Sequence, residues 1–162
     1  MATTVAVLAD THARGPFELP SAATSLLRSA DLIVHAGDIA TEEALGWLER
    51  FGPPLRAVQG NVDSPALLER LPETLELRVE DAVIGVVHDG GPAGGRLERL
   101  RARFPDADAV VFGHSHMPLH EEAEGFQIFN PGSPTQRRRA PWRSVGRASV
   151  DGARIRFEHL RL

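Results

Sequence analysis

The sequence predicts an α/β (α+β) fold: a four-layer αββα sandwich of two mixed β-sheets flanked by helices. Three observations predict it. In the first half of the chain, short apolar runs alternate with amphipathic stretches, as in strands joined by helices in a mostly parallel sheet. After residue 74 the apolar runs follow one another closely, as in antiparallel hairpins. The chain of 162 residues has the size of one ordinary domain, so we expect residues 1–162 to form a single domain.

The first half contains three predicted strands and two predicted helices. The strands are Val5–Ala9, Leu32–His35 and Leu55–Gln59, and the helices are Ser21–Ser29 and Thr41–Phe51. Thr41 suits the N-cap of its helix because its hydroxyl can accept a backbone N–H, and Glu42 and Glu43 complement the helix dipole. We expect Leu45 and Leu48 to face the sheet.

The second half is expected to contain more antiparallel pairs. Its predicted elements are strands at Leu75–Val79 and Val83–His88, a helix at about Arg96–Phe104, and strands at Ala109–Phe112, Phe126–Phe129, Arg143–Val150 and Ala153–Leu160. Only three residues separate the first two strands, too few for a helical crossover. Asp151-Gly152 joins the last two and suits a tight hairpin turn.

Composition excludes several classes of site. The chain has no cysteine, so a metal must be held by nitrogen and oxygen. All 18 basic residues are arginine, which excludes Schiff-base lysine chemistry and the phosphate-binding loop that ends in Gly-Lys-Ser/Thr. The formal charge of −4 lacks the basic footprint of a duplex-binding protein, so we expect no stable nucleic-acid partner.

The sequence also bears on location and assembly. No apolar run approaches the roughly 18 residues that a membrane span needs, so no membrane association is expected. The first residues do not combine a basic segment, a long apolar stretch and a small-residue cleavage site. We therefore expect a cytoplasmic protein, and a homo-oligomer is compatible with the sequence.

Polar, metal-competent side chains follow five of the apolar runs. They are Asp10, His12, Asp38, Asn61, His88, His114 and His116. In open α/β sheets ligands bind beyond the carboxyl ends of the strands, so these residues are expected to converge. Taken singly, each is more simply an ordinary strand-end polar residue; together they favour a site, because clustered histidines and carboxylates are costly without a metal.

Seven donors exceed one tetrahedral site and therefore indicate two metal ions. Imidazole mixed with hard oxygen suits Mn, Fe, Zn, Co or Ni better than Mg or Ca. Asp10 and His12 are two residues apart, as are His114 and His116, and in extended backbone each pair would project on one side and clasp one ion. Asp38, in a tight Gly-Asp turn, is the predicted bridge between ions roughly 3.5–4 Å apart.

These residues resemble the calcineurin-like metallophosphoesterases, most closely the small single-domain bacterial and archaeal phosphodiesterases of that family. The matching blocks run along most of the chain: Asp10–His12, Gly37–Asp38, Gly60–Asp63, His88, Gly113–His116 and Asn130–Ser133. The order and spacing of the blocks make chance a poor explanation. The family fold, a two-sheet sandwich flanked by helices, agrees with the predicted elements.

The resemblance implies two sets of metal ligands that share Asp38. One ion would be held by Asp10, His12, Asp38 and His116, and the other by Asp38, Asn61, His88 and His114. Asp38, Asn61 and His114 are the residues expected to serve catalysis. The implied activity is hydrolysis of a small phosphoester, most simply a phosphodiester, by a bridging hydroxide that attacks phosphorus in line. Manganese is the first choice of metal, with Fe, Zn, Ni or Co as alternatives.

One departure from the wider family bears on the substrate. Larger members place His after the Gly-Asn pair, where it helps stabilise the phosphoryl group or protonate the leaving group, whereas this chain has Val62. We therefore expect a preference for diesters or good leaving groups. Asp63 could substitute as the acid, or could serve only the turn. Asp89 stands where many relatives have Gly, and it would add negative charge beside the second ion.

Other polar residues have simpler readings. His35, inside an apolar run, is expected to be a buried, hydrogen-bonded support rather than a ligand. His120 and His159 are expected on the surface or in hairpins. Arg137–Arg139 could clamp a phosphate oxygen, although a solvated charge run is somewhat favoured because the spacing points no single arginine inward.

Two other functions compete with a phosphodiesterase. A phosphomonoesterase is the nearest alternative. A non-catalytic scaffold is the other, because the resembled family includes a retromer subunit that keeps the fold for assembly while its metal site is degraded. No ligand position is replaced in this chain, which argues for catalysis.

Overall fold

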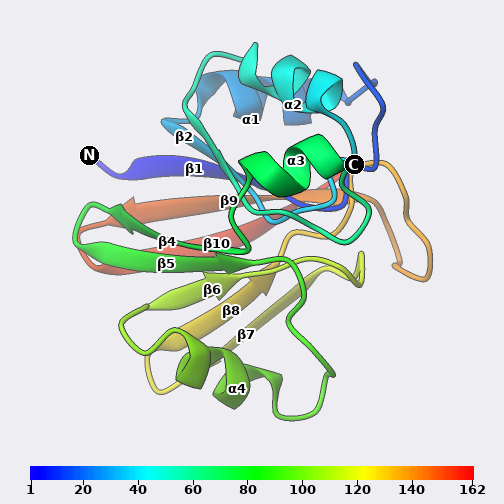
Figure 1. The fold of residues 1–162 in the computed structure, drawn as a ribbon. Coiled ribbons are helices and arrows are strands. Elements are labelled where there is room, and N and C mark those ends of the chain that lie inside the picture. The colour runs from blue at the N-terminus through cyan, green and yellow to red at the C-terminus, as the bar shows by residue number, and fades with distance from the viewer.

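The computed structural model describes residues 1–162 and contains two five-stranded mixed sheets (Figure 1). The first sheet has the order β10-β9-β1-β2-β3, with β1 (Thr3–Leu8), β2 (Leu32–His35), β3 (Leu55–Ala57), β9 (Ser144–Asp151) and β10 (Arg154–Arg161). The second has the order β4-β5-β6-β8-β7, with β4 (Thr74–Val79), β5 (Ala82–Val87), β6 (Ala109–Val111), β7 (Leu119–Ala123) and β8 (Phe126–Asn130).

Three apolar clusters define four layers. The largest lies between the sheets and includes Val7 and Val34 of the first sheet with Val86, Val111 and Phe129 of the second. A second cluster joins the outer face of the first sheet to α1 (Ser21–Ser29), α2 (Glu42–Glu49) and α3 (Pro65–Arg70). The third joins the second sheet to α4 (Arg96–Arg103), on the opposite side of the molecule (Figure 1). The predicted αββα sandwich is therefore confirmed.

The apolar run of β1 shows why the central strands lack alternation. Val5 and Val7 enter the cluster between the sheets, whereas Ala6 and Leu8 enter the cluster under the helices. A strand that is buried on both faces reads as a continuous apolar run. β1 pairs in parallel with β2, and β2 with β3, so the carboxyl ends of these strands lie at one edge.

Most predicted boundaries lie within two residues of the observed ones. The Thr41 hydroxyl accepts a hydrogen bond from Ala44 N at 3.1 Å and so caps α2, and Leu45 and Leu48 are buried as expected. β4 and β5 are antiparallel, as are β9 and β10. No helix in the structure is both long and apolar enough to span a membrane.

Two elements were missed. α3 has six residues, too few for the spacing of its apolar residues to reveal a helix in the sequence. Ser64 caps its start by accepting a hydrogen bond from Leu67 N. β7 was missed because most of its residues are exposed and polar, so its sequence lacks the alternation of apolar and polar residues that marks a half-buried strand. It pairs with β8 through a turn at Glu124 and Gly125, both with positive φ, a conformation typical of two-residue hairpins.

Candidate metal centre

The structure brings all seven predicted donors together at one end of the sandwich. Asp10 and His12 follow β1, Asp38 follows β2, and Asn61 follows β3. His88 follows β5, and the loop after β6 supplies His114 and His116. The site therefore receives side chains from both sheets.

The backbone that presents these side chains is left-handed rather than extended. Asp10, His12, Asp38, His114 and His116 have φ angles of 55°, 44°, 61°, 73° and 61°. The expectation of extended backbone at the two-apart pairs was wrong, although Asp10 and His12 do converge on one group as expected. The loops after β1 and β2 are held in this shape by hydrogen bonds between them, such as Asp10 N to Gly37 O at 3.0 Å and His12 N to Asp38 O at 2.9 Å.

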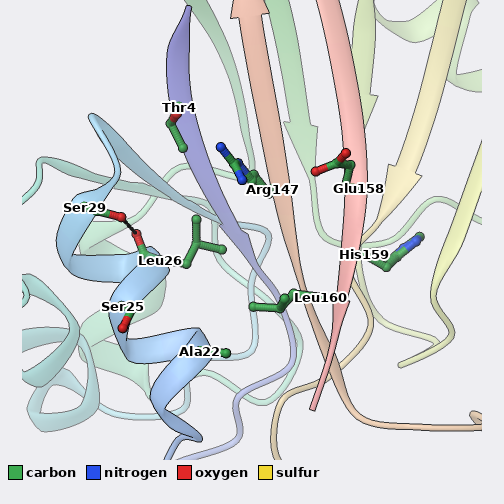
Figure 2. Close-up of a pocket in the computed structure, with 9 residues that line it drawn as sticks. All are labelled: Thr4, Ala22, Ser25, Leu26, Ser29, Arg147, Glu158, His159 and Leu160. Carbon is green, nitrogen blue, oxygen red and sulfur yellow. Dashed lines mark hydrogen bonds between the residues drawn. The ribbon is translucent and has the colours of Figure 1, made fainter.

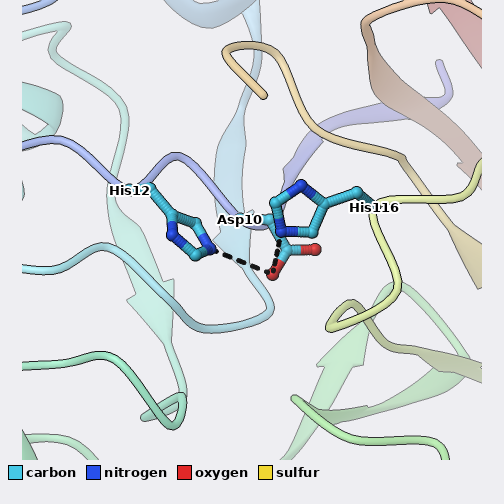
Figure 3. A group of neighbouring side chains, drawn as sticks. All are labelled: Asp10, His12 and His116. Atoms are coloured by element: carbon cyan, nitrogen blue, oxygen red, sulfur yellow. Dashed lines mark ion pairs between the residues drawn. The ribbon is translucent and has the colours of Figure 1, made fainter. Parts of the chain in front are cut away.

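Asp10, His12 and His116 form one group of metal-competent side chains (Figure 3). Asp10 Oδ1 lies 3.9 Å from His12 Nε2 and 3.8 Å from His116 Nε2. Asp10 Oδ2, His12 Nε2 and His116 Nε2 are buried and have no hydrogen-bond partner. Buried polar atoms are almost always paired in folded proteins, so two buried imidazole nitrogens that make no hydrogen bond and face the Asp10 carboxylate fit a cation bound between them.

Asp10, Asp38 and His88 form a second group next to the first. Asp38 Oδ2 lies 3.2 Å from both His12 Nε2 and His88 Nε2, and therefore sits between the two groups. Asn61 Oδ1 extends this second group, at 2.9 Å from His88 Nε2 and 3.1 Å from His114 Nδ1.

His114 and His116 do not form one clasp. His116 points toward Asp10, whereas His114 Nδ1 lies beside Asn61 and 3.3 Å from His88 Nε2. The pairing predicted from spacing alone was therefore wrong for these two histidines, although both belong to the cluster.

Hydrogen bonds to backbone carbonyl oxygens orient two of the imidazoles. His88 Nδ1 donates to Ala36 O at 2.8 Å, and His116 Nδ1 donates to Gln136 O at 2.7 Å. Each bond occupies Nδ1, so the other ring nitrogen, Nε2, faces the carboxylates. In metal-binding histidines the ring nitrogen that does not bind the metal typically donates a hydrogen bond of this kind.

Burial and charge perturb the ionisation of the cluster. Burial raises the pKa of Asp10 to about 7, and the negative charge of Asp38 acts in the same direction. Burial also acts to raise the pKa of Asp38, but hydrogen bonds from His88 and Val62 N outweigh it and lower that pKa. Burial lowers the pKa of both His12 and His116. Two histidines with depressed pKa values are available as neutral ligands near pH 7.

His35 is a buried support, as predicted. Its side chain is fully buried, and burial lowers its pKa to about 3. His35 Nδ1 accepts from Gly37 N at 3.1 Å, and its Nε2 lies 3.1 Å from Thr11 Oγ1. His35 therefore links the loop after β1 to the loop after β2.

Other supporting residues include Asn130 and Ser133, which the sequence identified only as part of a family block, and Thr135, which it did not identify. Asn130 Nδ2 donates to Gly113 O at 3.2 Å, and Ser133 Oγ donates to Asp10 O at 2.7 Å. Thr135 Oγ1 donates to Thr11 O at 2.8 Å. The available signal was the position of Asn130 directly after an apolar run, the same rule that identified the donors.

The two residues after Asn61 have separate roles. Val62 is exposed at 41% and places no ionisable group at the site. Asp63 is buried and accepts hydrogen bonds from Ala40 N and Gly60 N, both at 2.7 Å. Asp63 therefore serves the turn, and its carboxylate is already occupied by two backbone donors.

Two hollows differ in their relation to the cluster. One, of about 310 Å³, has Asn61, His88 and His114 in its wall together with the charged residues Glu73, Asp89 and Arg103. The other, of about 330 Å³, lies between α1 and β10 (Figure 2) and is lined by none of the clustered donors. Only the first opens next to the metal-competent residues.

The remaining two histidines lie outside the cluster. His120 is exposed on the β7–β8 hairpin, as expected. His159 is half-buried in β10, where its Nε2 donates to Asn130 O at 2.7 Å and its ring stacks on Phe129.

Comparison with known proteins supports the reading of the motifs. Residues 4–153 match the model of the calcineurin-like phosphoesterase superfamily domain. A probable metallophosphoesterase from Methanocaldococcus jannaschii is 35% identical over 151 residues, covering 91% of this chain and 76% of that protein. Another from Methanothermobacter thermautotrophicus is 32% identical over 160 residues, covering 97% and 91%.

Solved structures show the same fold. A Thermotoga maritima protein solved by solution NMR has a TM-score of 0.75 and 28% identity, covering 99% of both chains. Vacuolar Protein Sorting 29 from Cryptosporidium parvum has a TM-score of 0.78 and 21% identity, again over 99% of both chains. With the family model covering most of the sequence, the chain belongs to the calcineurin-like phosphoesterase superfamily.

Proposed function

We propose that this protein is a two-metal phosphoesterase that favours phosphodiesters, with manganese as the first metal to test. One observation carries the proposal. The Nε2 atoms of His12 and His116 make no hydrogen bond and face the buried carboxylate of Asp10, whose Oδ2 is also without a hydrogen bond. A protein that used this fold only for assembly would gain nothing from keeping these costly groups unpaired.

The geometry supports two ligand sets. Asp10, His12 and His116 surround one position, and Asn61, His88 and His114 surround the other. Asp38 Oδ2 is 3.2 Å from one histidine of each set, which suits a carboxylate shared by two ions. Imidazole nitrogens combined with carboxylate and amide oxygens suit Mn, Fe, Zn, Ni or Co.

The chain's own residues prepare the site for chemistry at phosphorus. When bound, two divalent ions supply positive charge to the phosphoryl oxygens and lower the pKa of water, so that hydroxide is available near neutral pH. Val62 N donates to Asp38 Oδ1 at 2.9 Å and fixes the shared carboxylate. Asn61 and His114 are exposed beside the 310 Å³ hollow, where they can reach the substrate.

The preference for diesters follows from the absence of an acid. Val62 offers no proton, and the Asp63 carboxylate is bound by two backbone donors. Alkyl monoesters have poor leaving groups and depend most on protonation of the leaving oxygen. Aryl diesters depend on it least, so they are the substrates that this site is suited to cleave.

Hydrolysis of paired aryl esters tests the proposal. Manganese-reconstituted protein should bind two ions and cleave bis(nitrophenyl) phosphate faster than the matched aryl monoester, nitrophenyl phosphate, and faster than any alkyl monoester. Asp38→Asn should lower the diester rate at least about 100-fold, because the shared carboxylate holds both ions. Val62→His should raise the monoester rate by about tenfold or more relative to the diester rate, because it supplies an acid.

Two results would contradict the proposal. Turnover of alkyl monoesters as fast as aryl diesters would replace a diesterase with a monoesterase. Binding of fewer than two ions without cleavage of either ester would favour an assembly role instead. Metal content and rates must come from the same sample, so that an empty site is not mistaken for an inactive one.

A further inference from the structure

The loop that joins β8 to β9 is fastened to the metal centre. Ser133 and Thr135 donate hydrogen bonds to the backbone oxygens of Asp10 and Thr11, at 2.7 and 2.8 Å. Gln136 O accepts from His116 Nδ1 at 2.7 Å. Because Gln136 is held by a residue of the site, the arginines that follow it begin at the rim of that site.

The three arginines lie in one tight turn. Ala140 N donates to Arg137 O at 2.9 Å, and Arg138 occupies the turn with a φ of 48°. Long side chains rarely adopt this left-handed backbone, and when they do it often marks a functional site. The turn directs neighbouring side chains to different places.

The contacts of the three guanidinium groups differ. Arg137 Nη1 donates to Pro141 O at 3.5 Å. Arg138 and Arg139 are exposed and make neither a side-chain hydrogen bond nor an ion pair within the protein. In a solvated charge run these last two arginines would be equivalent, but they differ in their electrostatic influence on the site.

Arg138 is the arginine whose charge reaches the metal centre. Burial is the main influence on the pKa of Asp10, His12 and His116, and the positive charge of Arg138 is a further influence that lowers all three. Arg138 is the only arginine of this run among the main influences on these three pKa values. The hydrogen bond that holds Gln136 O on His116 Nδ1 brings this turn to the site, and it places Arg138 within electrostatic reach of the group formed by Asp10, His12 and His116.

A cation placed beside a cation site is unfavourable unless an anion lies between them. Arg138 would be repelled by a divalent ion at Asp10, His12 and His116, and no carboxylate of the protein pairs with it. A phosphoryl group removes the conflict, because its oxygens can bind the ion and the planar guanidinium together.

We infer that Arg138 binds the non-bridging oxygens of the substrate's phosphoryl group, on the side of the site formed by Asp10, His12 and His116. The inference deepens the proposed function and rests on it for the identity of the substrate. The 310 Å³ hollow opens at the other group, beside Asn61, His88 and His114. The substrate is then held by its phosphoryl group at Arg138, and its organic group extends into that hollow.

Two binding measurements on matched variants test this assignment. Arg138→Gln removes the charge while keeping a polar side chain, and Arg139→Gln removes the neighbouring charge in the same turn. In the manganese-loaded protein, inorganic phosphate should bind about tenfold more weakly to Arg138→Gln, as measured by calorimetry, and with unchanged affinity to Arg139→Gln. Arg138→Lys should bind phosphate with an intermediate affinity, because it keeps the charge but loses the fork.

The affinity of Arg138→Gln for manganese alone should change in the opposite direction to its affinity for phosphate. Without phosphate, Arg138→Gln should bind manganese about two- to fivefold more tightly than wild type, because a repelling charge is gone. A variant that merely disturbed the loop would weaken both manganese and phosphate. Opposite changes in the two affinities therefore separate substrate binding from structural support.

The outcomes separate this inference from the proposed function. Wild-type phosphate affinity in Arg138→Gln, equal losses in Arg138→Gln and Arg139→Gln, or no phosphate binding by wild type would each overturn the role of Arg138. If phosphate binding depends on Arg138 but no phosphoester is cleaved, the role of Arg138 stands and the proposed hydrolysis fails.

Discussion

Asp10 is a fully buried carboxylate, and its Oδ2 has no partner in the protein. Burial raises its pKa to about 7, against an ordinary value of 3.8. Without metal, much of the Asp10 population is therefore protonated at neutral pH. Metal binding must displace that proton, so metal affinity is expected to rise with pH through about 7.

Asp10→Asn should change how the stability of the metal-free protein depends on pH. The unfolded carboxyl ionises near pH 3.8 and the folded one near pH 7, so wild type loses stability as the pH rises between these values. Asn has no charge to bury and escapes this loss. Between pH 5 and pH 8 the variant should gain about 2 kcal/mol relative to wild type in urea unfolding with chelator present. A difference that stays constant with pH would show that Asp10 ionises normally.

Residue types could be predicted from the sequence more fully than residue geometry. The rule that polar side chains follow apolar runs identified the seven clustered donors. The position of His35 inside an apolar run identified it as a buried, hydrogen-bonded supporting residue. Arg138 could not be distinguished from Arg137 and Arg139, because their difference arises from a left-handed turn at Arg138 and from the hydrogen bond between Gln136 and His116. Such a turn has no marker in a sequence without glycine at that position.

At the scale of elements, the loops after the strands determine the site. The loops after β1 and β2 continue the parallel pairing beyond the strands, with Ala13 N donating to Ile39 O at 3.1 Å. Pairing between loops holds Asp10, His12 and Asp38 in left-handed backbone. The strands could be predicted from local apolar runs, whereas these loop conformations depend on partners about 27 residues away and could not.

Gly60 is required by close packing rather than by its φ angle. A Cβ at this position would overlap Asp38 Oδ1 and Asp38 N. Gly60→Ala should therefore destabilise the protein by about 1–3 kcal/mol and weaken manganese binding, because the shared carboxylate must move. Urea unfolding and metal titration measure the two effects.

Gly46→Ala is the matched control for this prediction. Gly46 lies within α2, and an added Cβ there would meet no atom within 4 Å. The substitution should stabilise the protein by about 0.5–1 kcal/mol through helix propensity and leave manganese binding unchanged. If Gly60→Ala behaves like Gly46→Ala, the packing of Asp38 against Gly60 is not a constraint on the site.

At the scale of the whole molecule, the layers were predictable and their mutual orientation was not. Runs buried on both faces, amphipathic helices and late hairpins predicted two sheets with outer helices, and three apolar clusters confirm them. Which edges of the two sheets coincide depends on how the shared core packs. The apolar pattern alone therefore does not bring His88, from the second sheet, to Asp38, from the first; that proximity was expected from the family resemblance.

The proposed ions connect the two sheets and should therefore stabilise the folded chain. Asp10, His12, Asp38 and Asn61 follow strands of the first sheet, and His88, His114 and His116 follow strands of the second. Ions that bind only the folded state contribute about 2.7 kcal/mol at one hundred times their dissociation constant. For a chain of this length, chelation should lower the thermal midpoint by about 5–10 °C in calorimetry.

Asp38→Asn should lose most of this metal-dependent shift, because it removes a ligand from both proposed sets. Asp31→Asn should keep it, because Asp31 is an exposed carboxylate that accepts from Thr4 N before β2 begins. An equal shift in both variants would mean that manganese stabilises the protein from outside this cluster.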